Sequence, residues 1–148
     1  MNKKIIIFIA VILIALSGVL VYFGIRAINI NKYTNADTYV LGDKSIPSVK
    51  SVLGNKKIKS YKHSKSNIET LILEFEDPEK EQSVNKYIAQ IKESGNFIES
   101  NEGNSKVREI SNVEKENVFS VKTEITDKGF KLTIENGPGS IKINPIEE

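Results

Sequence analysis

The sequence predicts an α+β protein in which an N-terminal transmembrane helix leads into a two-layer sandwich, with one helix on a mainly antiparallel sheet. Three observations predict it. An uncharged apolar run opens the chain, one later segment has a single apolar stripe at helical spacing, and the segments around it alternate apolar and polar residues as half-buried strands do. The predicted order of elements after the first helix is ββαββββ.

The opening run from Ile5 to Ile25 contains 21 residues without a charge. At about 1.5 Å rise per residue it reaches about 31 Å as a helix, which is close to the thickness of a bilayer core. A cleaved signal peptide normally has an apolar region of about 7 to 15 residues before a small-residue cleavage site. We therefore expect residues 1–28 to be retained as an anchor that contacts the lipid bilayer through residues 5–25.

The charges that flank this run indicate its orientation. Lys3, Lys4 and the terminal amine precede it, whereas Arg26 and Lys32 follow it. Positive charge is enriched on the cytoplasmic side of membrane helices. The bias predicts a single-pass protein of the cell membrane with its domain on the outer face; a cytoplasmic domain is the alternative.

The composition after the anchor narrows the possible functions. Residues 33–148 carry 17 of the 21 basic residues and all 19 acidic residues, a formal charge of −2. Nucleic-acid binding normally requires a strongly basic domain, so we expect none here. The chain has no cysteine and one histidine, which argues against thiolate chemistry and transition-metal sites. We expect no cofactor.

The stretch YTNADTYVLGDKSIPSVKSVLGNKKI follows the anchor. Here the chain resembles small uncharacterised single-pass membrane proteins of low-GC Gram-positive bacteria, in which an anchor and a short linker lead into a segment similar to IPSV-x-x-VLG. The abundance of Lys, Asn and Ile agrees with AT-rich bacterial coding. The resemblance implies the layout of anchor and domain, and it implies no activity and no site residue.

The polar, Asn-rich residues 29–45 have neither helical nor strand periodicity and are expected to form a tether. Residues 46–148 would then form one extracytoplasmic domain. Ile46, Val49 and Leu53 lie at helical spacing before Gly54, which predicts a short helix. The segments Ile58–His63 and Glu69–Glu76 are predicted to form a hairpin.

The strongest pattern places Val84, Tyr87, Ile88 and Ile91 on one face of a helix that ends before Gly95. Asp77 is expected to cap this helix, with Pro78 at its first position. Four strands are predicted after it, followed by a last apolar alternation at Ile141 and Ile143; the strands are Asn96–Ser100, Lys106–Val113, Val118–Thr126 and Phe130–Asn136.

No catalytic constellation is evident. His63 is expected to be an exposed strand residue, because it has no nucleophile pattern near it. Several carboxylates cluster around Asp77 and suggest a Ca²⁺ site or an acid and base pair. Their spacing matches no Ca²⁺ loop, and acidic residues are favoured in the first turn of a helix. The cluster is therefore interpreted as structural.

Two other features are candidate sites. Seven lysines and no acid lie between residues 44 and 65, and a polyanion would contact this block through Lys56, Lys57, Lys59 and Lys62. The alternative is that these lysines protect an edge strand from pairing. Ala10, Ser17 and Gly24 share one face of the membrane helix and would allow close packing of another helix.

These observations favour a non-enzymatic envelope protein whose anchored domain binds or supports another component, either an envelope polyanion or a membrane protein. A membrane-tethered, carboxylate-dependent hydrolase acting on a cell-wall polymer is the alternative. A third hypothesis, a regulator that passes a signal through its helix, depends only on the small-residue face.

Overall fold

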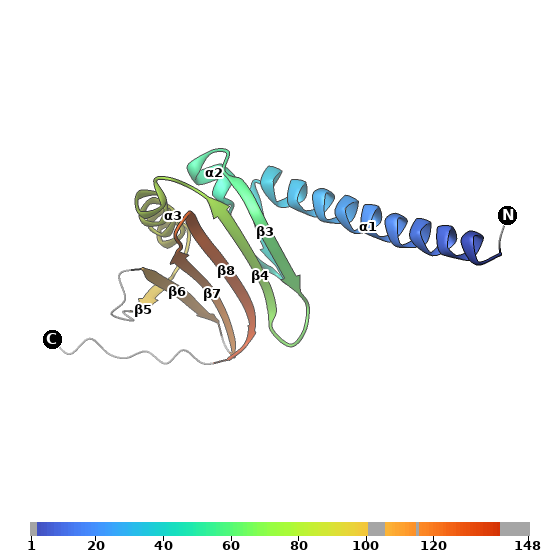
Figure 1. The fold of residues 1–148 in the computed structure, drawn as a ribbon. Coiled ribbons are helices and arrows are strands. Elements are labelled where there is room, and N and C mark those ends of the chain that lie inside the picture. Colours follow the sequence, from blue (N-terminus) through green and yellow to red (C-terminus); the bar gives the residue numbers. More distant parts are fainter. Residues whose placement is uncertain (1–2, 101–105, 115, 140–148) are drawn as a thin grey trace. The chain divides into compact units, whose positions relative to one another are not determined.

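The computed structural model describes residues 3–100, 106–114 and 116–139. The chain divides into two compact units, Met1–Tyr33 and Thr34–Glu148. The apolar alternation noted at Ile141 and Ile143 lies outside the described residues. Figure 1 shows the helices and strands along the chain.

Helix α1 (Lys3–Asn35) makes up the described part of the first unit, and its last two residues belong to the second unit. Within the part of the chain that the structure describes, α1 is the one helix long and apolar enough to cross a membrane, by length and composition. Its apolar side chains from Ile7 to Ile25 are exposed.

The prediction of a tether at residues 29–45 is wrong. Helix α1 extends to Asn35, and two residues later strand β1 (Thr38–Leu41) pairs with β2 (Lys44–Pro47) in a hairpin. Tyr39 and Leu41 alternate with exposed Thr38 and Val40, and both are at most 2% exposed. The domain therefore begins about ten residues earlier than predicted. The prediction failed because the apolar alternation of β1 is only four residues long and lies in an Asn-rich segment.

The predicted short helix is present as α2 (Val49–Leu53), but it begins after Ile46, which belongs to β2. Ser48 caps it, and its hydroxyl oxygen accepts a hydrogen bond from the Ser51 amide at 3.1 Å. Gly54 ends it at φ = 78°, with its amide donating to the Lys50 carbonyl at 2.9 Å. The predicted stop at Gly54 is thus confirmed.

Six antiparallel strands form the main sheet in the order β3-β4-β8-β7-β6-β5. Figure 1 shows them side by side in one twisted sheet. Their bounds are β3 Lys57–Ser64, β4 Glu69–Glu76, β5 Ile98–Ser100, β6 Val107–Glu114, β7 Asn117–Ile125 and β8 Gly129–Pro138. These strands confirm the predicted sheet, and the six strands predicted between Ile58 and Asn136 are each recovered within a few residues.

Helix α3 (Lys80–Ser94) and its predicted stripe are confirmed: Val84, Tyr87, Ile88 and Ile91 are each at most 1% exposed. Its predicted beginning is wrong, since the N-cap is Glu79 and Pro78 lies before the helix. Asp77 instead closes the preceding turn, where its Oδ1 accepts the Glu79 amide at 3.0 Å.

One face of the sheet carries the core. Helix α3 packs against β6, β7 and β8, while the β1–β2 hairpin contacts β4 and β8 on the same face. The Tyr87 hydroxyl joins the two parts of this layer by donating to the Pro47 carbonyl at 2.8 Å. The structure is thus an α+β sandwich, as predicted, with the unpredicted hairpin completing its second layer.

Candidate functional surfaces

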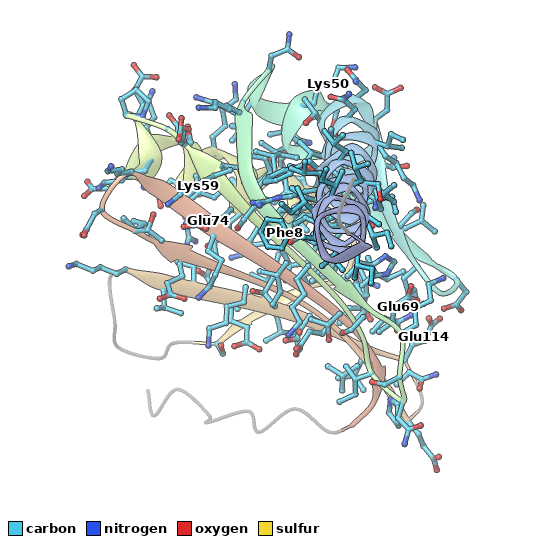
Figure 2. The ribbon with its side chains drawn as sticks, turned by 45° about the vertical axis from the view of Figure 1, so that its right-hand side comes forward. Phe8, Lys50, Lys59, Glu69, Glu74 and Glu114 are labelled. Atoms are coloured by element: carbon cyan, nitrogen blue, oxygen red, sulfur yellow. The ribbon has the colours of Figure 1, made fainter. Side chains whose placement is uncertain are left out.

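The seven lysines between residues 44 and 65, here called the lysine block, contain no acid in the sequence, but the fold brings acidic residues beside most of them. Because β3 pairs with the acidic strand β4, Lys57 Nζ lies 2.8 Å from Glu76 and Lys59 Nζ lies 3.6 Å from Glu74. Figure 2 shows Lys59 beside Glu74. Lys62 is exposed and lies opposite Ile72. Three of the four candidate residues are thus on one edge strand, and two of these three face a carboxylate.

The other lysines of the block are also paired. Lys44 contacts Glu114, Lys50 Nζ lies 3.9 Å from Asp37, and Lys65 Nζ lies 3.5 Å from Glu69. Exposed ion pairs of this kind contribute about 0 to 1 kcal/mol each. They reduce the local positive potential, but an anionic surface can still compete for the ammonium groups.

Lys56, the fourth candidate, has a structural partner. Its Nζ lies 2.9 Å from Oδ2 of Asp77, whose side chain is inaccessible to solvent. Burial alone would raise the pKa of the Asp77 carboxyl, but hydrogen bonds from Ser83, Lys56 and the Glu79 amide outweigh it and hold the pKa below its usual value. Lys56 is therefore the least available of the four to a polyanion.

Asp77 also lines an open groove of about 640 Å³ between the start of β3, the start of α3 and the β7–β8 turn. The groove is lined by Lys57, Glu76, Asp77, Pro78, Lys80, Asp127 and Lys128. A hydrogen bond from Lys57 and nearby lysines lower the pKa of Glu76. Glu76 and Asp77 are thus both held ionised, whereas a general acid needs a raised pKa.

The prediction that His63 is an exposed strand residue is wrong, because its side chain is 24% exposed and faces the hairpin layer. Its Nε2 lies 2.9 Å from Oε1 of Glu69. The other carboxylate oxygen of Glu69 accepts the Gly42 amide at 2.7 Å, while Asn136 donates to the Leu41 carbonyl at 2.8 Å. These side chains hold the hairpin turn against the sheet.

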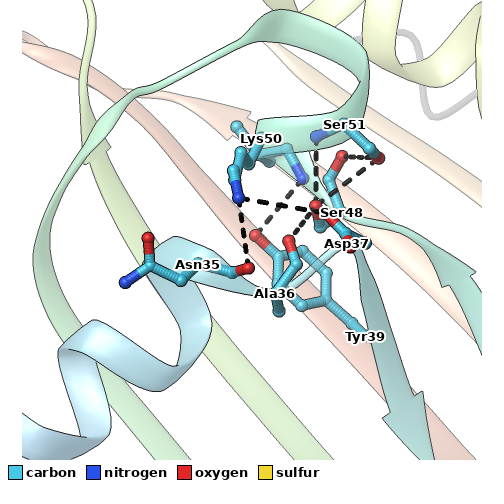
Figure 3. Close-up of polar contacts among 8 residues, drawn as sticks. Asn35, Ala36, Asp37, Tyr39, Ser48, Lys50 and Ser51 are labelled. Atoms are coloured by element: carbon cyan, nitrogen blue, oxygen red, sulfur yellow. Dashed lines mark hydrogen bonds and ion pairs between the residues drawn. The ribbon is translucent and has the colours of Figure 1, made fainter.

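The chain between α1 and β1 is held by the beginning of α2 (Figure 3). The buried Ser48 hydroxyl donates to the Ala36 carbonyl at 2.6 Å, and the Ser48 amide donates to the Asp37 carbonyl at 3.0 Å. Lys50 Nζ donates to the Asn35 carbonyl at 3.3 Å. The carbonyls of Asn35, the last residue of α1, and of the two residues that follow it therefore have partners at the beginning of α2, an arrangement that no sequence pattern predicted.

The small-residue face of α1 remains a prediction. The Ser17 hydroxyl donates to the Ile14 carbonyl within the helix at 2.8 Å, so this polar group is satisfied without a partner helix. A Cβ placed on Gly24 would meet no atom within 4 Å. The structure thus leaves space beside Gly24.

Among the described residues, no group of three or more His, Cys, Asp or Glu side chains is placed to hold a metal ion. Comparisons with protein-family models, curated proteins and solved structures found no match to this chain.

Proposed function

We propose that the chain is a single-pass protein of the cell membrane whose outer domain is a non-enzymatic binding or structural module of the envelope. The observation that carries the proposal is α1, an exposed apolar helix that passes into the folded domain with only Ala36 and Asp37 between Asn35 and β1. Because α1 ends only two residues before β1, little extended chain is left for signal-peptide cleavage between the apolar run and the domain.

The polarity of the helix ends supports the orientation. Tyr22 and Phe23 lie near the end of the apolar run, followed by Arg26, and such aromatic residues favour the membrane interface. The lysines at positions 3 and 4 favour an inner N-terminus.

Retention and orientation are tested together in intact cells. Full-length mass in the carbonate-resistant membrane fraction is expected, and a Ser66→Cys variant should react with an impermeant maleimide while Asn2→Cys should not. The chain has no other cysteine, so all labelling reports the introduced one. A soluble form beginning near residues 18–30 would contradict retention; labelling of Asn2→Cys alone would reverse the orientation.

The groove beside Asp77 favours the hydrolase alternative, because it brings Glu76, Asp77 and Asp127 together. The lowered pKa values of Glu76 and Asp77 argue against either residue as the general acid that such a hydrolase needs. Release of soluble fragments from purified wall polymer by the wild type, abolished in Glu76→Gln, would establish the hydrolase. We expect no release.

An envelope polyanion is the partner proposed for the exposed lysines Lys57, Lys59 and Lys62. Each lysine near an anionic surface adds about 1 kcal/mol. Sedimentation of the domain with anionic vesicles should be seen at low salt and lost near about 0.5 M salt, where the Debye length is only a few ångströms. A variant with these three lysines changed to Gln should not sediment with the vesicles. The control is Lys86→Gln on the exposed face of α3, which should sediment as the wild type does. Unchanged sedimentation of the triple variant would mean that these lysines do not form the binding surface.

A further inference from the structure

The main sheet has one face that packs on α3 and a second face, here called the open face, that carries exposed apolar side chains. Helix α3 contacts β6, β7 and β8, and the positions that it covers are buried, as at Ile110. Because side chains alternate along a strand, Val113 of β6 lies on the open face. The register places Val118 of β7 opposite Val113, and it places Ile98 of β5 opposite Ser111, two positions before Val113. Val113, Val118 and Ile98, here called the apolar patch, therefore lie on three neighbouring strands.

The apolar patch is accessible. Val113 is 45% exposed, Ile98 is 53% exposed, and Val118 is half-buried. In residues 34–100, 106–114 and 116–139, the other large apolar side chains of comparable exposure are Ile68, between β3 and β4, and Val40, on the β1–β2 hairpin. Apolar side chains that are exposed as a group, unlike single ones, indicate a contact surface.

The size of the apolar patch favours an occupant from the same chain. A specific interface between two proteins normally buries at least about 1,000 Å², and three side chains, one of them half-buried, provide only a fraction of this area. A segment that is covalently joined to the domain needs less contact area, because a short linker holds it at an effective concentration of about 1 mM or more.

Strand β8 ends beside this patch. The Gly139 amide donates a hydrogen bond to the Glu116 carbonyl at 3.1 Å, which holds the chain against the β6–β7 turn. A Cβ on Gly139 would lie 3.4 Å from Val118 Cγ2, so the backbone at this point is within van der Waals distance of the patch. Pro138 and Gly139 are residues that favour a turn. The chain thus reaches the patch where its sequence favours a change of direction.

The next residues have the pattern that such an occupant requires. They lie outside the described residues, and their sequence is Ser140, Ile141, Lys142 and Ile143. In an extended chain the two isoleucines share one side and Lys142 takes the other. Four extended residues span about 13 Å, whereas two strand spacings, from β7 to β5, measure about 10 Å. The segment is therefore long enough to cross the patch.

We propose that residues 140–143, here called the strap, turn back after β8 and cover the apolar patch, with Ile141 on Val113 and Ile143 on Ile98. The strap crosses the open face from β7 to β5 and removes the two exposed side chains of the patch from water. Another protein can reach these side chains only after the strap has left, so the strap controls access to this end of the sheet.

Disulfide formation in the full chain tests the contact. Because the chain has no native cysteine, each introduced pair can be scored alone. Val113→Cys with Ile141→Cys should close within one chain under mild oxidation, since a disulfide needs Cα atoms about 4.4 to 6.8 Å apart. The control is Val40→Cys with Ile141→Cys, because Val40 is 60% exposed but lies on the hairpin. The control pair should close at least about tenfold more slowly.

Closure is measured in detergent as the loss of maleimide-reactive thiol from the monomer band, so it depends on neither retention nor orientation in the membrane. Equal rates for the two pairs, or disulfides formed only between chains, would overturn the proposal.

The exposure of the patch provides a second test. Ile141→Asn with Ile143→Asn removes the apolar contacts of the strap and should raise the rate at which a maleimide labels Val113→Cys about tenfold. Ser140→Asn with Lys142→Asn is the matched control, because it changes as many residues on the other side of the strap, and it should leave the rate unchanged. Equal labelling rates in the two variants would rule out the strap as the occupant, and melting curves like that of the wild type show that both variants fold.

Discussion

At the scale of single residues, Lys56 was predicted to contact a polyanion at the surface, but in the structure it forms an ion pair with the buried Asp77. The side chains of this pair are 19% and 0% exposed, whereas those of the neighbouring pair, Lys57 and Glu76, are 74% and 41% exposed. A buried ion pair is costly to break from one side, because the remaining charge has lost both water and its partner. The two adjacent lysines should therefore respond very differently to the same substitution.

Lys56→Met is expected to lower the free energy of unfolding by about 3 kcal/mol at pH 7. The pKa of Asp77 in the folded state lies below its unfolded value of about 3.9. The stability that the pair provides is thus present above that value and is lost as the pH falls through the lower folded-state pKa. Urea unfolding between pH 7 and pH 2 should show the wild type and the variant converging at acid pH.

The matched control for this experiment is Lys57→Met, which removes an exposed partner and should cost under about 1 kcal/mol. Similar losses from both variants would mean that Lys56 and Asp77 do not form a buried pair.

Gly42 is required at the hairpin turn for two reasons. Its φ is +59°, and an added Cβ would lie 2.7 Å from Asn136 Nδ2. Gly42→Ala should combine a backbone cost of about 1 kcal/mol with displacement of the Asn136 amide from the Leu41 carbonyl. Gly54→Ala is the control, since φ is +78° there but no atom lies within 4 Å; calorimetry that gives equal losses for the two variants would show that the close approach contributes nothing.

At the scale of elements, helix α3 is held by one face. Ile88 is fully buried in the centre of its stripe, whereas Lys86 points to solvent. Ile88→Ala should lower the free energy of unfolding by about 2 to 5 kcal/mol, and Lys86→Ala should change it by under about 0.5 kcal/mol. Chemical denaturation measures both, and small, equal effects would contradict the packing of α3 on the sheet.

At the scale of the whole molecule, the β1–β2 hairpin determines where the folded domain begins. Tyr39 and Leu41 are at most 2% exposed, and each side chain of this size contributes about 1.5 to 3 kcal/mol by burial. A fragment of residues 34–148 should therefore unfold cooperatively, while residues 46–148 should be less stable by at least about 3 kcal/mol. Urea titrations of the two fragments measure this difference. Equal unfolding midpoints would mean that residues 34–45 add no stability to the domain and act as a tether.

The sequence by itself determined the elements whose signals are local. The apolar run of α1, the stripe of α3 and the alternation in β4, β7 and β8 each extend over several turns or residue pairs, so their periods are readable without any tertiary contact. The end of α2 at Gly54 was also predictable from the sequence, because it depends on the backbone conformation of a single glycine.

Only the tertiary structure decided which of these residues meet. The hairpin at residues 38–47 is too short to be stable alone and forms because the sheet supplies Glu69 and Asn136 to its turn. The positive potential of the lysine block is reduced because strand pairing brings the acidic residues of β4 beside Lys57 and Lys59. The register of β6, β7 and β8 brings Ile68 and Val113, which are 45 positions apart in the sequence, to the same end of the sheet. Pairing between distant segments is set by the packing of the whole sheet, and no local pattern encodes it.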